Sequence, residues 1–443
     1  MDEDLLHDVV QAALRAGADA AEAVGAESRA LSVTSRKGEL EEVEREESRD
    51  LSLRVFVGAR PASVSGSDLS PGARARLVER AVAMARLAPE DPYAGLLRAG
   101  ELARAPFREL DLFDTAEPSP QALEARAAAA DAAAWAQRGV TNTDGGSASW
   151  SASRWRLVTS QGFSGAQAAS SFSVGATAIA GEGAGMERGG DGRSTRWEGD
   201  LPPPDAVGAE AGRRAAARVG ARKISSRTAP VLFENRLALQ LLSPFVGAVS
   251  GPAVARGVSF LKERLGQRVF PAAVTVAEEP WRPRGLGSAA FDDEGAPATP
   301  RDLVAEGVLT TWLLNAASAR QLGLETTGHA SRGGAGAAGV SPHNLTVRPG
   351  AHTPAELMAQ AGEGLQVTSM FGPSLNSNTG DWSAGVSGVW WEGGEPAFPV
   401  TELTVAGNLV DIYARLVVAS DLEIRGANNS PSLFVDGLAV AGA

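Results

Sequence analysis

The chain has 443 residues, 44% hydrophobic and 21% charged, a composition typical of a folded globular protein with two or three domains. Its formal charge of −12 disfavours nucleic acid and anionic membranes as partners, because both require a positive protein surface. The absence of cysteine excludes disulfides, thiol catalysis, Cys-based zinc sites and iron–sulfur clusters. No signal-peptide pattern opens the chain and no run approaches the roughly 18 apolar residues of a membrane helix, so we expect a cytoplasmic protein.

The first hundred residues predict a region of helices and strands. Residues 4–16 place apolar side chains at helical spacing between acidic residues and a glycine, which predicts an amphipathic helix. Two strands are expected at 20–34 and 51–57, and the acidic segment 37–49 between them is typical of a solvated strand or hairpin. A helix follows over 71–87, opened by a serine cap and a first-turn proline.

The middle of the chain begins with a loop-rich connection over 88–120, where proline and glycine are frequent. An Ala-rich helix is expected at 121–137, strands at 140–180 and a further helix at 202–219. The Gly-rich segment 181–192 lacks the G-K-[ST] ending of a phosphate loop, which favours a mobile hairpin tip.

A new domain is expected from Pro230 onward. The segment 237–249 is strongly apolar, and 260–270 predicts a helix. Thr353 and Glu356 form a capping-box pattern for a short helix. The remaining short apolar runs predict strands at 231–233, 274–277, 307–314, 345–347 and 432–440.

The stretch 364–413 predicts a twisted antiparallel meander. Its run VSGVWWEGGEPAFPV places Gly393-Gly394 between two strand-like arms, a strong hairpin pattern. Because the stretch is rich in Gly, Ser and Asn, its backbone is either supported by neighbours or offered as a docking surface.

Few residues offer catalytic chemistry. HExxH, HExxxH and a complete G-x-S-x-G in its strand-turn-helix setting are absent, and only four histidines occur. His329 is flanked by small residues that would admit a ligand, although a loop histidine bonded to backbone is the simpler interpretation. His343 and His352 are expected in solvent, as are the turn-like carboxylates of 292–294 and Asp381, which could otherwise form an acidic catalytic pair.

Motifs across the second half resemble those of the TldD/PmbA metalloprotease family, in its PmbA (TldE) branch. They are FDDEG at 291–295, EGVL at 306–309 and SAR-x-LG at 318–323, followed by GPSLNSNTGDWSAGVSGVWW at 372–391. The first half resembles the family more loosely, for instance in RVFVGAR at 54–60.

The resemblance implies where a metal site would lie. In the TldD branch a helix carries HExxxH and a C-terminal cysteine adds a metal ligand. In register with 256–269, those positions fall on Leu242, Ser243 and Gly247, and the cysteine has no counterpart. The resemblance therefore implies no catalytic or metal residue and no cofactor in this chain, with zinc supplied by a TldD-type partner.

The implied function is that of the non-catalytic half of a two-subunit peptidase. Such a pair would enclose a chamber in which extended, unfolded or modified peptides are degraded or processed. Two other classes remain open, a stand-alone peptide-binding scaffold and a hydrolase with its own carboxylate or serine site. We hypothesise that the substrate groove or subunit contact is lined by Asn376, Thr379, Gly380, Asp381, Asn408 and His329.

The expected fold class is α+β. An N-terminal α/β domain with a mixed sheet would precede a C-terminal domain rich in antiparallel strands. The expected divisions are a helix-strand region at 1–100, a middle α+β region at 101–228 that packs with it, and a β-rich domain at 229–443 that corresponds to the family's peptidase domain.

Overall fold

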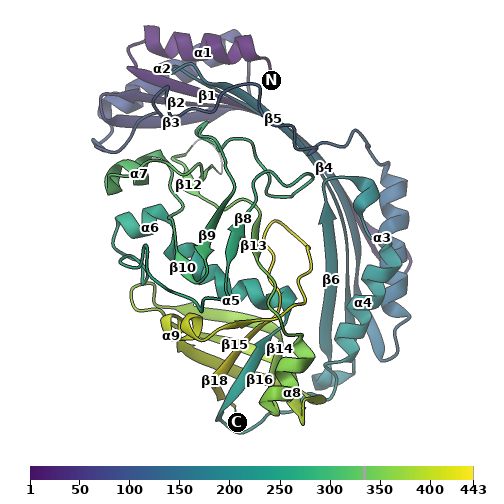
Figure 1. Ribbon diagram of the computed structural model, residues 1–443. Helices are drawn as coiled ribbons and strands as arrows, with labels where there is room; N and C mark the ends of the chain where they lie inside the picture. The colour runs from purple at the N-terminus through teal and green to yellow at the C-terminus, as the bar shows by residue number, and fades with distance from the viewer. Residues whose placement is uncertain (333–335, 443) are drawn as a thin grey trace.

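The structure, a computed structural model, describes residues 1–332 and 336–442. A long six-stranded sheet curves around the C-terminal half, with helices on its outer side (Figure 1). Its order is β3-β2-β1-β4-β5-β6, and every neighbouring pair is antiparallel. The strands are β1 (Ala20–Arg36), β2 (Glu39–Val57), β3 (Arg60–Gly66), β4 (Val140–Thr159), β5 (Ser164–Ala180) and β6 (Glu187–Thr195).

This sheet corrects one expectation and extends another. The mixed sheet expected in the N-terminal part is wrong, because consecutive strands there join through hairpins or return antiparallel. The acidic segment forms the solvated start of β2, as predicted. Because β4 pairs with β1 along its length, the regions 1–100 and 101–228 share one sheet, while the proposed domain limits stay a prediction.

Four helices cover one face of the sheet, and the sequence alternation explains which face. Leu31 and Val33 point toward the helices, whereas Ser28, Ser32 and Thr34 alternate to the opposite face. The register places further small residues of β4 and β5 beside these serines. The helices are α1 (Glu3–Arg15), α2 (Pro71–Leu87), α3 (Pro120–Trp135) and α4 (Pro204–Ala216).

The Gly-rich segment 181–192 forms a hairpin connection, as expected, but only its first half is a turn. A short 3-10 turn (Gly183–Gly185) leads into β6, which already begins at Glu187. The glycines of β6 are therefore strand residues, and a Cβ at Gly189 would lie 2.1 Å from the backbone nitrogen of Ala215 in α4.

The C-terminal half centres on a second sheet of order β16-β15-β14-β7-β18-β17. The pair β7–β14 is parallel and the other pairs are antiparallel, so this is the mixed sheet of the molecule. Because β16 also pairs with β18, the sheet closes on itself. The strands are β7 (Arg227–Phe233), β14 (Glu363–Leu375), β15 (Asp381–Glu392), β16 (Glu395–Asn408), β17 (Val417–Val418) and β18 (Leu433–Ala441).

The predicted meander is confirmed as β14, β15 and β16. Gly393 and Gly394 join the last two strands with φ of +61° and +84°, the left-handed values that a tight hairpin turn requires. The outer side of β16 is not an open edge throughout, because residues Thr404 to Ala406 pair with β18.

Smaller elements fill the space between the two sheets. A four-stranded sheet has the order β10-β9-β8-β13, and α5 begins immediately after β7. The elements are α5 (Asn235–Ala248), α6 (Gly251–Ala255), β8 (Val276–Glu278), β9 (Arg301–Ala305), β10 (Val308–Leu309), α7 (Ala316–Leu322), β11 (Ala330–Ser331), β12 (Gly339–Val340), β13 (Leu345–Val347), α8 (Pro354–Ala361) and α9 (Leu409–Ala414), with a second 3-10 turn at Glu198–Asp200. Among the described residues, no helix is long and apolar enough to cross a membrane.

The helix expected at 260–270 is wrong. The N–H groups of Lys262, Arg264 and Gln267 each bond to the carbonyl three residues earlier, which makes separate turns. Gly266 then takes a φ of +73° and donates to the carbonyl of Leu309. Apolar side chains of this segment, such as Phe270, are thus buried although they come from successive turns and not from one face of a helix.

Helices α3 and α4 pack closely enough to require a glycine at their crossing. A Cβ at Gly208 would lie 1.9 Å from the carbonyl oxygen of Ala130. We expect Gly208→Ala to force the helices apart and to lower the free energy of unfolding by about 1–3 kcal/mol. Denaturant unfolding measures this, with Gly199→Ala as the control, since a Cβ there meets nothing within 4 Å. Equal stability of the two variants would contradict the close packing.

Candidate functional site

A groove runs between α5 and the extended end of β14. It consists of two hollows of about 500 and 530 Å³, which share Gln240 of α5 as a lining residue. Residues of β14 lie along both, from Gln366 and Thr368 at one end to Pro373 and Leu375 at the other. Helix and strand therefore form the two sides of one elongated site.

The edge of β14 is open along this groove. Parallel pairing with β7 covers only residues 365 to 367, after which the chain leaves β7 and turns into α5. Within the described part of the chain, β15 is the one strand that pairs with β14 beyond Val367. Phe371 and Leu375 are 52% and 37% exposed on this segment. An open edge presents unpaired backbone donors and acceptors to any extended chain that enters.

Helix α5 places two of the predicted positions in the groove and one in the core. Ser243 and Gly247, four residues apart on one helical face, line the larger hollow. Leu242 is 2% exposed and packs in the hydrophobic core. Pro244, which also lines the hollow, has no N–H to bond the carbonyl of Gln240.

This helix face does not fit a metal ion. Leucine and glycine side chains carry no donor atom, and the serine hydroxyl is the one oxygen that these positions offer. Across residues 1–332 and 336–442, no group of three or more His, Asp or Glu side chains is placed to hold a metal.

Five of the six residues hypothesised to line the site lie together at the tip that joins β14 to β15. Asp381 accepts hydrogen bonds from the Thr379 hydroxyl at 2.7 Å and from the Asn408 amide at 3.0 Å. These bonds hold the pKa of Asp381 below its usual value, with the Thr379 hydroxyl as the main cause. Gly380 donates to the carbonyl of Asn376, and Ser377 between them lines the groove. The tip thus borders the hollow beside Gly247 through Ser377, whereas the five hypothesised residues are not among those that line it.

His329, the sixth residue, lies elsewhere. It is 1% exposed, with Nε2 2.7 Å from Glu278 Oε2 and Nδ1 2.8 Å from the Thr327 hydroxyl. The order of hydroxyl, imidazole and carboxylate resembles a nucleophile triad, but none of the three lines the groove. Burial lowers the pKa of His329, against the opposing effect of its bond to Glu278. The expectation that His343 is a solvent residue is wrong, since its Nε2 lies 2.9 Å from the Gly328 carbonyl, whereas His352 is exposed.

The expected solvent exposure of the carboxylates at 292–294 is also wrong. Asp292 is 2% exposed and accepts backbone N–H groups from Glu294, Ala296 and Ala330. Its carboxylate therefore organises the turn that follows, and Glu294 does the same for the start of α7 by accepting from Ala316. A carboxylate followed by glycine three residues later is a local turn pattern that could have indicated this role.

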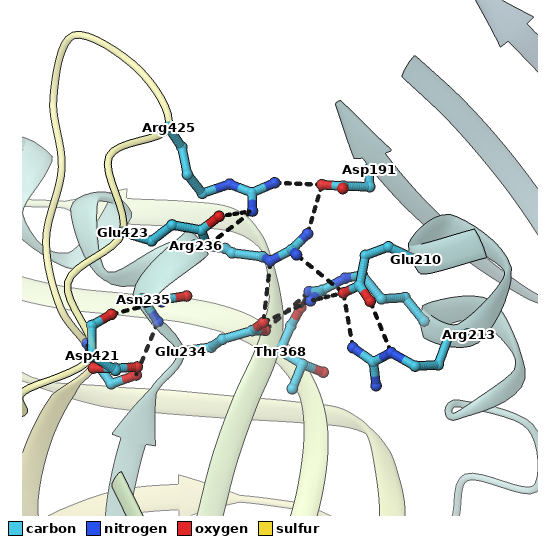
Figure 2. A network of polar contacts seen from close by, with 12 residues as sticks. Asp191, Glu210, Arg213, Glu234, Asn235, Arg236, Thr368, Asp421, Glu423 and Arg425 are labelled. Carbon is cyan, nitrogen blue, oxygen red and sulfur yellow. Dashed lines mark hydrogen bonds and ion pairs between the residues drawn. The ribbon is translucent and has the colours of Figure 1, made fainter. Parts of the chain in front are cut away.

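Sequence reasoning missed an ionic network at the other end of the groove (Figure 2). Asp191 of β6 accepts from Arg236 of α5 at 2.6 Å, and it also bonds Arg425 between β17 and β18. Glu210 of α4 pairs with Arg236 at 3.1 Å. The partners in these contacts lie 26 to 234 residues apart in sequence, so no local pattern could reveal them.

The network also reaches the open strand. Arg214 of α4 pairs with Glu234 at 2.6 Å and donates to the carbonyl of Thr368 at 3.3 Å. Thr368 is the first residue of β14 beyond its pairing with β7. Arg214, from the other half of the molecule, thereby hydrogen-bonds the first carbonyl of β14 beyond its pairing with β7.

Comparisons with known proteins agree over nearly the whole chain. Family models match three times, as PmbA/TldA metallopeptidase domain 1 over residues 21–85, central domain over 113–219 and C-terminal domain over 226–442. Metalloprotease PmbA of Escherichia coli O157:H7 is 37% identical and covers 99% of this chain and 96% of its own. The metalloprotease PmbA homolog of Haemophilus influenzae is 34% identical, with 98% and 94% covered.

Solved structures show the same fold. A putative modulator of DNA gyrase from Bacteroides thetaiotaomicron superposes with a TM-score of 0.91 at 25% identity, covering 100% of this chain and 99% of its own. TldE from Thermococcus kodakarensis has a TM-score of 0.87 at 18% identity, with 99% and 100% covered. At that identity the second likeness supports the α+β fold alone.

The buried Asp292 generates a pH prediction. Burial raises the pKa of Asp292 from about 3.8 to about 7, so the folded chain holds a proton between these values that the unfolded chain releases. The contribution of this group to stability is then present below about pH 4 and is lost as the pH rises to about 7. We expect the difference in free energy of unfolding between the parent and Asp292→Asn to fall over this range, by up to about 1.4 kcal/mol per pH unit. Urea unfolding at several pH values measures it, and a constant difference would contradict the raised pKa.

Proposed function

We infer the function from the family: the chain belongs to the PmbA/TldD metallopeptidase family, as a PmbA/TldE-type member. We propose that it is the non-catalytic, substrate-binding subunit of a heteromeric peptidase. A TldD-type subunit supplies the zinc and the catalytic residues. This chain contributes part of the surface on which an extended, unfolded or modified peptide is held for cleavage.

The observation that carries the proposal is the open edge of β14 beside α5. An extended peptide adds to such an edge as a further strand, and main-chain hydrogen bonds supply affinity that does not depend on its sequence. The edge beyond Val367 could pair with several residues of a peptide. Gly247 and Ser243 on the facing helix leave room for the peptide backbone, because their side chains are small.

The composition of α5 supports the assignment of catalysis to a partner. The three positions that align with HExxxH hold Leu242, Ser243 and Gly247, and their geometry places one of them in the core. The side chains at these positions offer no group that could hold a metal ion and activate water, which supports the assignment. The formal charge of −12 gives no support to direct DNA binding, despite the gyrase-related name of one structural neighbour.

Metal content tests whether zinc and catalysis belong to the partner subunit. We expect the purified chain to hold far less than one zinc per molecule and to leave an unfolded peptide intact, because α5 lacks ligands. Addition of a TldD-type subunit with an intact HExxxH should bring both zinc and cleavage. Elemental analysis and a peptide-cleavage assay measure these quantities. One zinc per molecule with cleavage by the chain alone would overturn the proposal.

The tip at Asp381 tests the groove. The double change Asp381→Ala with Asn408→Ala removes the bonds that join the ends of β15 and β16, so we expect peptide affinity and cleavage by the reconstituted pair to fall roughly three- to tenfold. Stability should fall by about 0.5–2 kcal/mol, because Asn408 also caps the start of α9 by accepting the N–H of Val410.

A matched control for the tip is Arg348→Ala with Asp302→Ala, which removes an exposed pair outside the groove. This control should keep the parent affinity and cleavage. If the Asp381 and Asn408 variant also retained parent affinity and turnover, the tip would have no role in the groove.

A further inference from the structure

The two halves of the groove differ in chemistry, and the difference bears on which peptides it accepts. We propose that the groove is selective for a peptide that carries a carboxylate about six residues from an apolar side chain. The carboxylate occupies the half beside α4, and the apolar side chain occupies the half beside Gly247. This inference rests on the proposed function and adds a substrate preference to it.

The half beside α4 is rich in guanidinium groups. Four arginines line it against a single carboxylate, that of Glu234. The arginines are Arg188, Arg213, Arg214 and Arg218. Three of them come from the end of α4 and the residues just after it, so they converge on one wall of the hollow. Guanidinium groups bind carboxylates through paired, charge-assisted hydrogen bonds.

Each of these arginines already pairs with an acidic side chain, but the pairs differ in their exposure to solvent. Arg214 is 16% exposed and bonds both oxygens of Glu234, so it serves the network. Arg213 also bonds both oxygens of its partner, Glu210, but is 64% exposed, and Arg188 is 71% exposed and contacts Asp144 at 3.1 Å through one nitrogen. Exposed pairs of this kind contribute little to stability, so their cations can turn toward a ligand carboxylate.

Arg218 completes the group. It lies 3.0 Å from Glu187 and is 26% exposed, and its Nη1 donates to the carbonyl of Arg188. The bond to that carbonyl holds the Arg218 guanidinium against the backbone of Arg188, and both residues line this hollow. A carboxylate that enters here meets several N–H donors in a partly enclosed hollow, where they act more strongly than in open water.

The half beside Gly247 is mostly apolar. Its lining includes Pro244, Val258, Phe260, Pro373, Leu375 and Trp382, with Arg256 as the one charged member. Val258 and Leu375 are 39% and 37% exposed, so apolar surface remains open in the hollow. An apolar peptide side chain would cover this surface, and its affinity gain would scale with the area removed from water.

The separation of the two halves sets the spacing in the peptide. Ser369 lies in the basic half and Leu375 in the apolar half, six residues apart on β14. A bulge between Phe371 and Ser374 shortens this stretch, and β15 matches it with the five steps from Ser387 to Trp382, roughly 17 Å at about 3.3 Å per residue. A peptide that spans the same distance places its carboxylate and its apolar side chain five to six residues apart.

Binding of labelled ten-residue peptides to the full chain, followed by fluorescence anisotropy, tests the preference. The reference peptide carries Glu and Leu six residues apart in a Ser/Gly/Thr background with an amidated C-terminus. We expect Glu→Gln, Leu→Ser and a one-residue spacing each to weaken binding roughly three- to tenfold. A Gln peptide with a free C-terminus at the same distance shows whether a terminal carboxylate serves as well as a side chain.

Arginine variants assign the effect to its residues. Arg213→Gln and Arg218→Gln, each alone, should reduce the preference for Glu over Gln toward one while retaining binding of the Gln peptide. Arg98→Gln, an 82% exposed arginine outside the groove, should keep the parent preference. Circular dichroism confirms that each variant is folded.

The outcomes separate this inference from the proposed function. Peptide binding with no preference for Glu over Gln, or a preference that disappears in Arg256→Gln and persists in Arg213→Gln and Arg218→Gln, would overturn the inference and leave the groove as a peptide site. Failure of the full chain to bind any of the peptides, alone or with a TldD-type subunit, would overturn both.

Discussion

The groove beside α5 depends on the unequal lengths of two neighbouring parallel strands, β7 and β14. Strand β7 stops at Phe233 and its chain becomes α5, while β14 continues to Leu375. A strand that outruns its neighbour must leave backbone groups unpaired, and a helix cannot pair with them as a strand would. The groove, its open edge and the helix that faces it all follow from this mismatch.

The long sheet contacts the C-terminal half at two ends, and a different kind of interaction stabilises each end. At one end Phe107, Phe163 and Phe291 pack together with ring centroids 4.7 to 5.9 Å apart. At the groove end Asp191 and Arg236 join the halves through ions. Asp191 and Arg236 are only 6% and 19% exposed, and salt screens such pairs much less than surface pairs, so the groove end of the contact is expected to persist at moderate ionic strength.

Local patterns predicted the fold well where one stretch of chain decides the outcome. The helix over 71–87 and the Gly393-Gly394 hairpin appear where caps and turn residues placed them. The same reasoning failed at 260–270, where apolar spacing came from burial in turns, and at Asp292, whose burial depends on distant N–H groups. The tip around Asp381 could be found from sequence, but the Arg214 contact to Thr368 could not, because 154 residues separate its partners.

The burial of Leu242 has a consequence for any attempt to convert this chain into a metalloenzyme. Its side chain packs against the core formed with Phe245 and Leu241, so a histidine placed there would put an imidazole among apolar groups rather than in the groove. Substitution at three helix positions would recreate the HExxxH sequence, but its two histidine side chains would not converge on one metal ion. A functional graft would have to rotate or repack α5 as a whole, so single substitutions would not build a metal site on the groove face of this helix.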